Sequence, residues 1–227
     1  MNYIILSSKP WNENLAESLA NQVKGNWLQI SAIDDFTVEK IDKIRPEKIF
    51  IPHWSHKIHE KIFNNYECII FHMTDLPFGR GGSPLQNLIS RGLESTKITA
   101  IRIDGGIDSG DVYLKKDLSL LGTAEEVFIR ANNVMERMIL EIIKKNLSPI
   151  PQTGDPVKFK RRTEEMSTIK EIDTIEDLFN HIRMLDAEGY PKAFLETDNF
   201  RLEFSRASLK ANKNIIADVK ITALKNE

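Results

Sequence analysis

Two turns of this sequence hold side chains that together can move a proton. His72 directly follows the apolar run 68–71, and Asp108 lies in a glycine-rich turn that follows the apolar run 98–103. An imidazole titrates near neutral pH, and a carboxylate beside it suits general acid–base catalysis. We expect both runs to be buried strands whose ends bring the two turns into one cleft, because open α/β sheets bind ligands at the carboxyl ends of their strands.

Each of these residues also has a plainer interpretation. An isolated histidine at a strand end is more often an ordinary, partly buried side chain than a catalytic one. An aspartate in a glycine-rich turn is most simply explained by an Asx-turn, and Arg80 can be a surface arginine. The residues that flank them are therefore needed to distinguish a catalytic role from these plainer ones.

The residues around His72 and Asp108 resemble two signatures of a known family. Residues 72–84, HMTDLPFGRGGSP, are similar to the His-x-Ser-x-Leu-Pro-x-x-Arg-Gly-x-x-Pro signature of the folate-dependent formyltransferases. Residues 104–111, DGGIDSGD, resemble the Asp-x-Gly-x-Asp-x-Gly-Asp turn of that family. The order and spacing of the two motifs fit as well. The resemblance runs from the first strand to about residue 150, and more loosely to about residue 210.

The resemblance implies an N-formyltransferase that moves a formyl group from 10-formyltetrahydrofolate to a primary amine without a metal. His72 would be the base or proton shuttle, and Asp108 would orient its ring and favour its charged form. Arg80 would support the loop. The positions expected to bind the folate donor are Leu76, Pro77, Arg80, Gly81, Asp104, Gly105, Gly106 and Ile107.

One position departs from the family pattern. An asparagine normally stands two residues before the histidine and helps to stabilise the oxyanion, whereas this chain has Ile70, which cannot donate a hydrogen bond. His53 and Ser55 are candidate replacements, because they follow a predicted strand at 48–51, and Thr74 is a further candidate orienting group. Ile70 also leaves open a folate-binding relative whose activity is lost or hydrolytic.

Three histidines, His53, His56 and His59, invite a metal-site interpretation. At a spacing of three residues, the three side chains would not lie on one face of a helix. The cluster also has no thiolate or fixed carboxylate to complete a set of metal ligands. We expect solvated or helix-capping histidines rather than a metal site.

The composition is that of an ordinary globular protein. The 227 residues are 41% hydrophobic and 28% charged, with a net charge of −2 that argues against a dominant nucleic-acid surface. A single cysteine, Cys68, excludes an intrachain disulfide framework and suits the cytoplasm. No run approaches about 18 apolar residues, so we expect no membrane association, and residues 1–10 are interpreted as a first strand rather than a signal peptide.

Alternating strands and helices predict an α/β fold with a mainly parallel sheet covered by helices on both faces. The family resemblance makes this a formyltransferase-type, Rossmann-like domain. The predicted strands are 3–6, 27–30, 48–51, 68–71 and 98–103, and the predicted helices are 14–23, 38–44, 84–92 and 123–145. Thr123 and Glu126 form a capping-box pattern at the start of the last helix.

Prolines at 149 and 151 predict a boundary between a catalytic domain, residues 1–150, and a small C-terminal α+β module, residues 151–227. The module should hold a helix at 174–186 and strands at 193–195, 201–204 and 215–221. It resembles the short module that follows the catalytic domain in this family and is much shorter than the C-terminal barrel of methionyl-tRNA formyltransferases. We therefore favour a nucleotide-linked amino-sugar as the acceptor, with methionyl-tRNA as the alternative and a homodimer as a further possibility.

Overall fold

The computed structural model describes residues 1–224, which divide by their contacts into two compact units. Unit 1 comprises Met1–Gly81, Lys97–Leu118 and Ile129–Lys158. Unit 2 comprises Gly82–Thr96, Ser119–Phe128 and the chain from Phe159 onward. The expected domain division at residue 150 stays a prediction.

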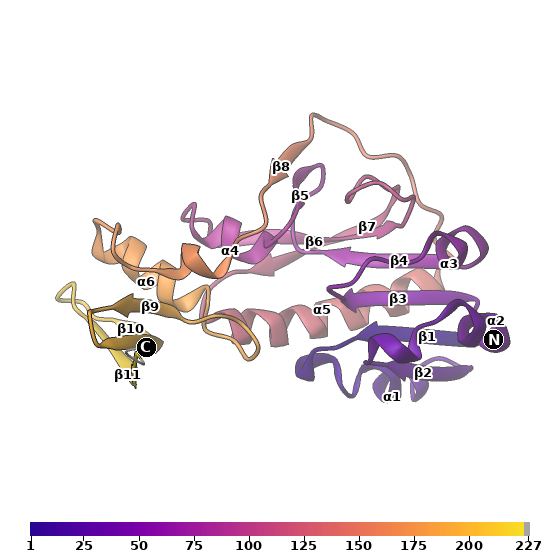
Figure 1. Cartoon of the computed structure of the whole chain (residues 1–227). Helices are drawn as coiled ribbons and strands as arrows, with labels where there is room; N and C mark the ends of the chain where they lie inside the picture. Colours follow the sequence, from indigo (N-terminus) through magenta and orange to yellow (C-terminus); the bar gives the residue numbers. More distant parts are fainter. Residues whose placement is uncertain (225–227) are drawn as a thin grey trace. The chain divides into compact units, whose positions relative to one another are not determined.

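Unit 1 is built on a six-stranded sheet with the strand order β2-β1-β3-β4-β6-β7 (Figure 1). The strands span Asn2–Ser7 (β1), Asn26–Ile30 (β2), Lys48–His53 (β3), Glu67–His72 (β4), Ser95–Arg102 (β6) and Val112–Ser119 (β7). β1 to β4 are parallel neighbours, which confirms the mainly parallel sheet. The sequence did not predict β7, because charged residues at 115–117 interrupt its alternation of apolar and polar positions.

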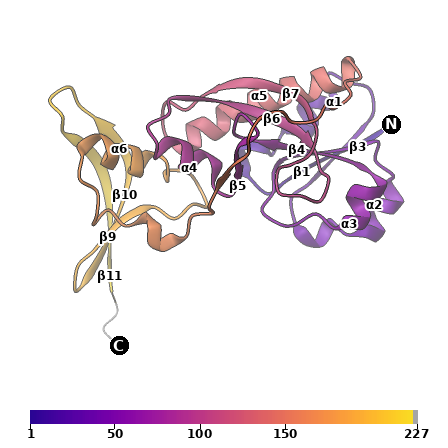
Figure 2. The same cartoon turned by 90° about the horizontal axis from the view of Figure 1, so that it is seen from above.

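Helices cover both faces of this sheet (Figure 2). On one face, α1 (Leu15–Ala20) lies beside α5 (Ala124–Lys144), and Ser18 Oγ donates a hydrogen bond to Glu136 at 2.5 Å. On the other face lie α2 (Val38–Ile44) and α3 (Glu60–Asn65). Short 3-10 turns at Pro10–Asn12 and Ile33–Asp35 join strands to helices. The predicted helix positions are confirmed, and α3 was not predicted.

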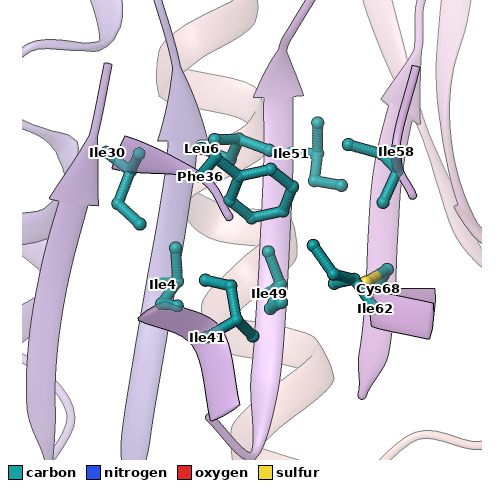
Figure 3. Close-up of a cluster of buried hydrophobic side chains, with 10 residues drawn as sticks. All are labelled: Ile4, Leu6, Ile30, Phe36, Ile41, Ile49, Ile51, Ile58, Ile62 and Cys68. Atoms are coloured by element: carbon teal, nitrogen blue, oxygen red, sulfur yellow. The ribbon is translucent and has the colours of Figure 1, made fainter. Parts of the chain in front are cut away.

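The core between the sheet and the α2–α3 layer consists mainly of aliphatic side chains (Figure 3). Alternate residues of each strand enter it, as the period of two along a strand requires. They pack against side chains from the two helices. The cluster comprises Ile4, Leu6, Ile30, Phe36, Ile41, Ile49, Ile51, Ile58, Ile62 and Cys68. Burial raises the pKa of the Cys68 thiol to about 12, so this side chain acts as a packing residue.

The long helix α5 confirms two predictions from the sequence. Its start is a capping box, in which the Thr123 nitrogen donates to Glu126 Oε2 at 2.8 Å and the Glu126 nitrogen donates to Thr123 Oγ1 at 3.3 Å. Its apolar stripe is buried throughout, as expected for core residues; the stripe comprises Val127, Ala131, Val134, Met138 and Ile142.

The direction of β6 corrects one expectation. β6 runs antiparallel to β4, so that Thr99 lies opposite His72 and Arg102 lies opposite Ile69. The carboxyl end of β6 is therefore remote from the carboxyl end of β4. The expectation that two neighbouring strand ends would bring His72 and Asp108 together was wrong in its reason, because parallel strands alone share an edge in that way.

Unit 2 holds a three-stranded antiparallel sheet with the order β11-β10-β9. Its strands span Ala193–Glu196 (β9), Phe200–Leu209 (β10) and Ile215–Ala223 (β11), and its helices span Pro84–Ile89 (α4) and Ile175–Arg183 (α6), with a 3-10 turn at Glu164–Ser167. Thr174 caps α6 by accepting from the Asp177 nitrogen, which confirms the predicted helix start. Buried Arg183 donates to the carbonyl oxygens of Leu120 and Gly122.

Two short strands, β5 (Phe78–Gly81) and β8 (Val157–Phe159), form a separate pair beside the main sheet. The segment that follows α5 runs back along the sheet to reach β8 (Figure 1). Within residues 1–224, no helix is long and apolar enough to cross a membrane.

Candidate active site

His72 is the last residue of β4 and is 7% exposed. It shares one face of the strand with Ile70 and Cys68, because side chains alternate along a strand. The loop that follows is pinned to β6 by Thr99, whose Oγ1 donates to the Thr74 carbonyl at 2.6 Å and accepts from the Leu76 nitrogen at 3.3 Å. The histidine therefore stands on a strand end whose next turn is held in place.

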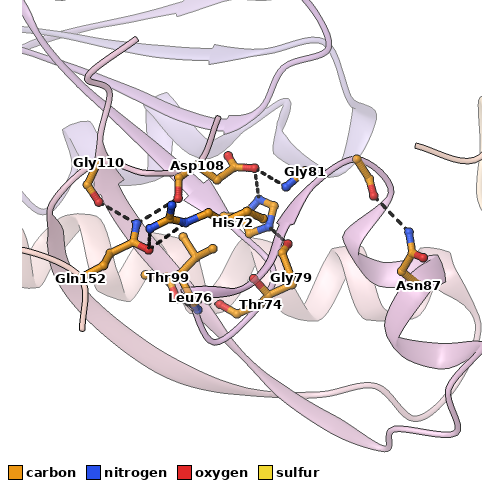
Figure 4. Close-up of polar contacts among 12 residues, drawn as sticks. His72, Thr74, Leu76, Gly79, Gly81, Asn87, Thr99, Asp108, Gly110 and Gln152 are labelled. Carbon is orange, nitrogen blue, oxygen red and sulfur yellow. Dashed lines mark hydrogen bonds and ion pairs between the residues drawn. The ribbon is translucent and has the colours of Figure 1, made fainter. Parts of the chain in front are cut away.

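Both nitrogens of the His72 ring face acceptors (Figure 4). Nε2 lies 2.7 Å from the carbonyl oxygen of Gly79, and Nδ1 lies 3.5 Å from Oδ2 of Asp108. A carbonyl oxygen only accepts hydrogen bonds, so Nε2 is protonated and donates a hydrogen bond to the Gly79 oxygen. Nδ1 is then the ring nitrogen with a lone pair in the neutral form, and once protonated it can donate to Asp108.

Asp108 reaches His72 because its turn folds back over the sheet. Its backbone is left-handed, with φ of +48°, and its Oδ2 accepts a hydrogen bond from the Gly81 nitrogen at 2.8 Å. The turn closes where the Arg102 nitrogen donates to the Asp111 carbonyl. A Cβ at Gly110 would stand 1.7 Å from the Arg102 carbonyl oxygen, so only glycine fits this closure.

A cavity of about 160 Å³ opens beside Asp108. Ile70, Ile101 and Phe63 make its apolar wall, and the turn from Asp104 to Gly106 adds polar backbone groups. Lys57 and Arg102 line it too, and both are exposed. A Cβ at Gly105 would meet the Phe63 ring at 3.4 Å and narrow the space. The lining thus combines an apolar wall with backbone groups that can donate and accept hydrogen bonds.

The predicted donor-binding positions fall into three groups. Asp104, Gly105 and Gly106 line the cavity, and Asp104 also makes an Asx-turn by accepting from the Gly106 nitrogen at 2.9 Å. Ile107 is 75% exposed, outside the cavity lining. The others lie on the loop between β4 and the end of β5, where Leu76 is buried; they are Leu76, Pro77, Arg80 and Gly81. Their role in binding stays a prediction.

The candidates proposed to replace the missing asparagine are spread over the sheet edge. At the position of the missing asparagine, the Ile70 side chain lines the cavity and makes its wall apolar there. His53 is the last residue of β3, the strand next to β4, and the centroid of its ring lies 5.5 Å from that of Trp11. Ser55 is exposed in the loop that follows. Thr74 is fully buried, and its Oγ1 has no hydrogen-bond partner within the described residues. Their oxyanion role stays a prediction.

Two of the clustered histidines have structural environments that explain them. Burial, with Lys9 nearby, lowers the pKa of His53 to about 4, so the ring is neutral at pH 7. His59 is the N-cap of α3, and its Nδ1 accepts from the Lys61 nitrogen at 3.1 Å, as the helix-capping interpretation expected. No group of three or more possible metal ligands occurs within residues 1–224.

Gln152 was not predicted from the sequence as a site residue. This residue follows the two prolines that were interpreted as a domain boundary, and no local pattern marks it as part of a site. Its Oε1 accepts from Nε and Nη2 of Arg80, at 3.2 and 2.8 Å, and its Nε2 donates to the carbonyls of Asp108 and Gly110, at 2.9 and 2.8 Å (Figure 4). Arg80 is thus tied to the segment after α5, and its expected roles in supporting the loop and binding the donor stay predictions.

Comparison with known proteins gives the same assignment as the two motifs. A family described as the methionyl-tRNA formyltransferase C-terminal domain matches residues 164–222. A solved structure described as a methionyl-tRNA formyltransferase from Clostridium thermocellum is 51% identical, covering 98% of this chain and 99% of that one, with a TM-score of 0.95. The chain belongs to the formyltransferase family.

Two further relatives are less similar to this chain than the Clostridium thermocellum protein. The methionyl-tRNA formyltransferase of Rickettsia felis is 29% identical over 57% of this chain and 45% of its own length. The chain spans about half the length of the curated relatives it matches. A sugar N-formyltransferase structure from Shewanella is 15% identical with a TM-score of 0.65, covering 100% of this chain and 99% of that one, which shows a shared fold.

Proposed function

We propose that this protein transfers the formyl group of 10-formyltetrahydrofolate to the amino group of methionyl-tRNA. The observation that carries the proposal is the 51% identity, over almost the whole of both chains, to the Clostridium thermocellum protein described as a methionyl-tRNA formyltransferase. That protein has nearly the same extent as this one, so the short C-terminal module no longer argues against a tRNA acceptor. The acceptor named as the alternative in the sequence analysis is therefore better supported than the amino-sugar it favoured.

The donor supplies an activated formyl carbon, and the cavity beside Asp108 is where its ring fits. Phe63, Ile70 and Ile101 offer flat apolar surface, and the backbone of the turn offers donors and acceptors for the ring edge. At about 160 Å³ the cavity suits the ring alone, so the rest of the donor would lie outside it. Lys57 and Arg102, both exposed, add positive charge to the lining of this cavity.

The attacking amine has to lose a proton, and His72 is placed to take it. The hydrogen bond from Nε2 to Gly79 fixes the ring orientation and leaves Nδ1 as the accepting atom. Because the lone pair of Nδ1 faces Asp108, which lines the cavity, the proton of the amine reaches Nδ1 by way of the Asp108 carboxylate. Asp108 can then accept a hydrogen bond from the protonated Nδ1 across the present 3.5 Å. Gly81 orients the carboxylate through its backbone nitrogen, so the pair is positioned before the substrate arrives.

A turnover assay on the full chain tests this proposal. Release of tetrahydrofolate from 10-formyltetrahydrofolate would be measured with methionyl-tRNA, with uncharged tRNA, with a nucleotide-linked amino-sugar and with no acceptor, and His72→Ala would be the control. Release that depends on methionyl-tRNA and disappears in the variant supports the proposal. Release with the amino-sugar alone would assign the other acceptor, release without any acceptor would indicate hydrolysis, and binding without release would indicate a folate-binding relative.

A further inference from the structure

We propose that Gln152 is a positioning residue that holds Asp108 beside His72, and that this site therefore extends into the segment after α5. The inference rests on the proposed function for its kinetic consequence, whereas its structural consequence can be measured without turnover. Gln152 neither touches His72 nor lines the cavity itself; it contacts two lining residues, Asp108 and Gly110, through their backbone carbonyls, and its effect would pass through the backbone of the Asp108 turn.

The side-chain amide of Gln152 uses its complete hydrogen-bonding capacity. Oε1 has two lone pairs and receives two N–H groups of Arg80, while Nε2 has two hydrogens and gives them to the carbonyls of Asp108 and Gly110. The guanidinium only donates and the carbonyls only accept, so a single orientation of the amide satisfies all four bonds. A side chain that merely filled space would not need this match.

The turn that Gln152 holds needs external support. Asp108 is a non-glycine residue in the left-handed region, a conformation that persists only when its surroundings impose it. Two contacts do so from opposite ends of the residue, because Gly81 bonds its carboxylate and Gln152 bonds its carbonyl. Removing the second contact leaves the carboxylate tethered but frees the backbone that sets its direction.

Gln152 is itself held in register by its neighbours. The Ile150 nitrogen and carbonyl pair with those of Val112 at 2.9 and 2.7 Å, and further along the Val157 nitrogen donates to the Pro77 carbonyl at 3.2 Å. The segment 150–157 is thus attached at both ends to the two stretches that carry the site. Gln152 lies between these attachments and joins the Arg80 loop to the Asp108 turn.

The decisive variant is Gln152→Glu, which keeps the length and shape of the side chain. One carboxylate oxygen can still accept from Arg80, but the other would face two carbonyl oxygens and could donate to neither. We expect kcat to fall roughly 10- to 100-fold, as small misplacements of catalytic groups do. The matched control is Gln86→Glu, which removes another buried amide donor, the one from Gln86 to the Met184 carbonyl, away from His72 and Asp108.

Two readouts separate positioning from stability. The His72 ring signals in NMR spectra, assigned by their loss in His72→Ala, should move in Gln152→Glu toward their positions in Asp108→Asn, and should stay unchanged in Gln86→Glu. In the Asp108→Asn background, Gln152→Glu should lower kcat little further, because residues that act as a unit have non-additive effects. Arg80→Lys, which cannot make the two bonds to Oε1, should shift the ring signals in the same direction and serves if Gln152→Glu does not fold.

Wild-type ring signals and wild-type kcat in a folded Gln152→Glu protein would overturn the inference, as would fully multiplicative effects of Gln152→Glu and Asp108→Asn. A wild-type protein without turnover would instead remove the proposed function, and the ring signals would still report whether Gln152 places Asp108.

Discussion

The Gly81 nitrogen donates a hydrogen bond to Oδ2 of Asp108 at 2.8 Å. This bond joins the two sequence motifs directly, because Gly81 belongs to the first and Asp108 to the second. The oxygen that accepts it is also the one that faces Nδ1 of His72. One carboxylate oxygen therefore both binds the backbone of the loop at Gly81 and faces the His72 ring.

We expect His72→Ala and Asp108→Asn each to lower kcat by about 10²- to 10⁴-fold, the range for loss of a general acid–base group. The double variant should be little worse than the worse single variant, since the two residues act as one unit. Steady-state kinetics with methionyl-tRNA would check this, with melting temperatures as the folding control. Effects that multiply would show that the two residues act separately.

The second prediction concerns Ile70, which lines the cavity where the family has an asparagine. In Ile70→Asn an amide donor would enter the cavity beside Asp108, and we expect kcat to rise, because a donor aimed at developing negative charge stabilises the transition state. The protein should also lose about 1–3 kcal/mol of stability, since Ile70 packs against the aliphatic core. Ile70→Leu is the control that keeps the wall apolar. An unchanged or lower kcat in the folded asparagine variant would mean that another group already fills this role.

The half-buried ring of His53 predicts how stability depends on pH. Burial lowers its pKa in the folded protein to about 4, while the unfolded chain binds the proton near the ordinary value of about 6.5. The unfolded state therefore binds more protons between these values, and the contribution of neutral His53 is complete above about pH 6.5 and is lost as the pH falls toward 4. Denaturant unfolding of wild type and His53→Gln across this range should show a shallower decline in the variant. Equal slopes would refute the assignment.

Closure of the Asp108 turn predicts a strict requirement for glycine at position 110. In Gly110→Ala the new Cβ would collide with the Arg102 carbonyl oxygen, so the turn has to move. We expect a loss of about 1–3 kcal/mol, typical of overpacking, together with loss of turnover. Gly92→Ala is the comparison, because a Cβ there meets nothing within 4 Å, although the residue has a positive φ. Wild-type stability and turnover in Gly110→Ala would contradict the described closure.

Much of the sheet, and the meeting of the His72 and Asp108 side chains, were predictable from residue patterns. The four parallel strands are short apolar runs between turn residues, which is a strong local signal. β7 was not predictable because consecutive charges at 115–117 mask it, and the reversal of β6 was not predictable because strand direction leaves no mark on a single apolar run. Gln152 was missed for a related reason, since its partners lie more than 40 residues away in the sequence.

The attachment of residues 150–157 to both motif-bearing stretches has a consequence for synthesis of the chain. Both motifs have been translated once Asp111 is added, yet the partner of Arg80 and the strand that pairs with β5 come only with Gln152 and β8. A nascent chain that ends before β8 can build the parallel strands but cannot finish the loops above them. The last part of the pocket to become fixed during translation is then supplied by residues far downstream of the histidine and the aspartate.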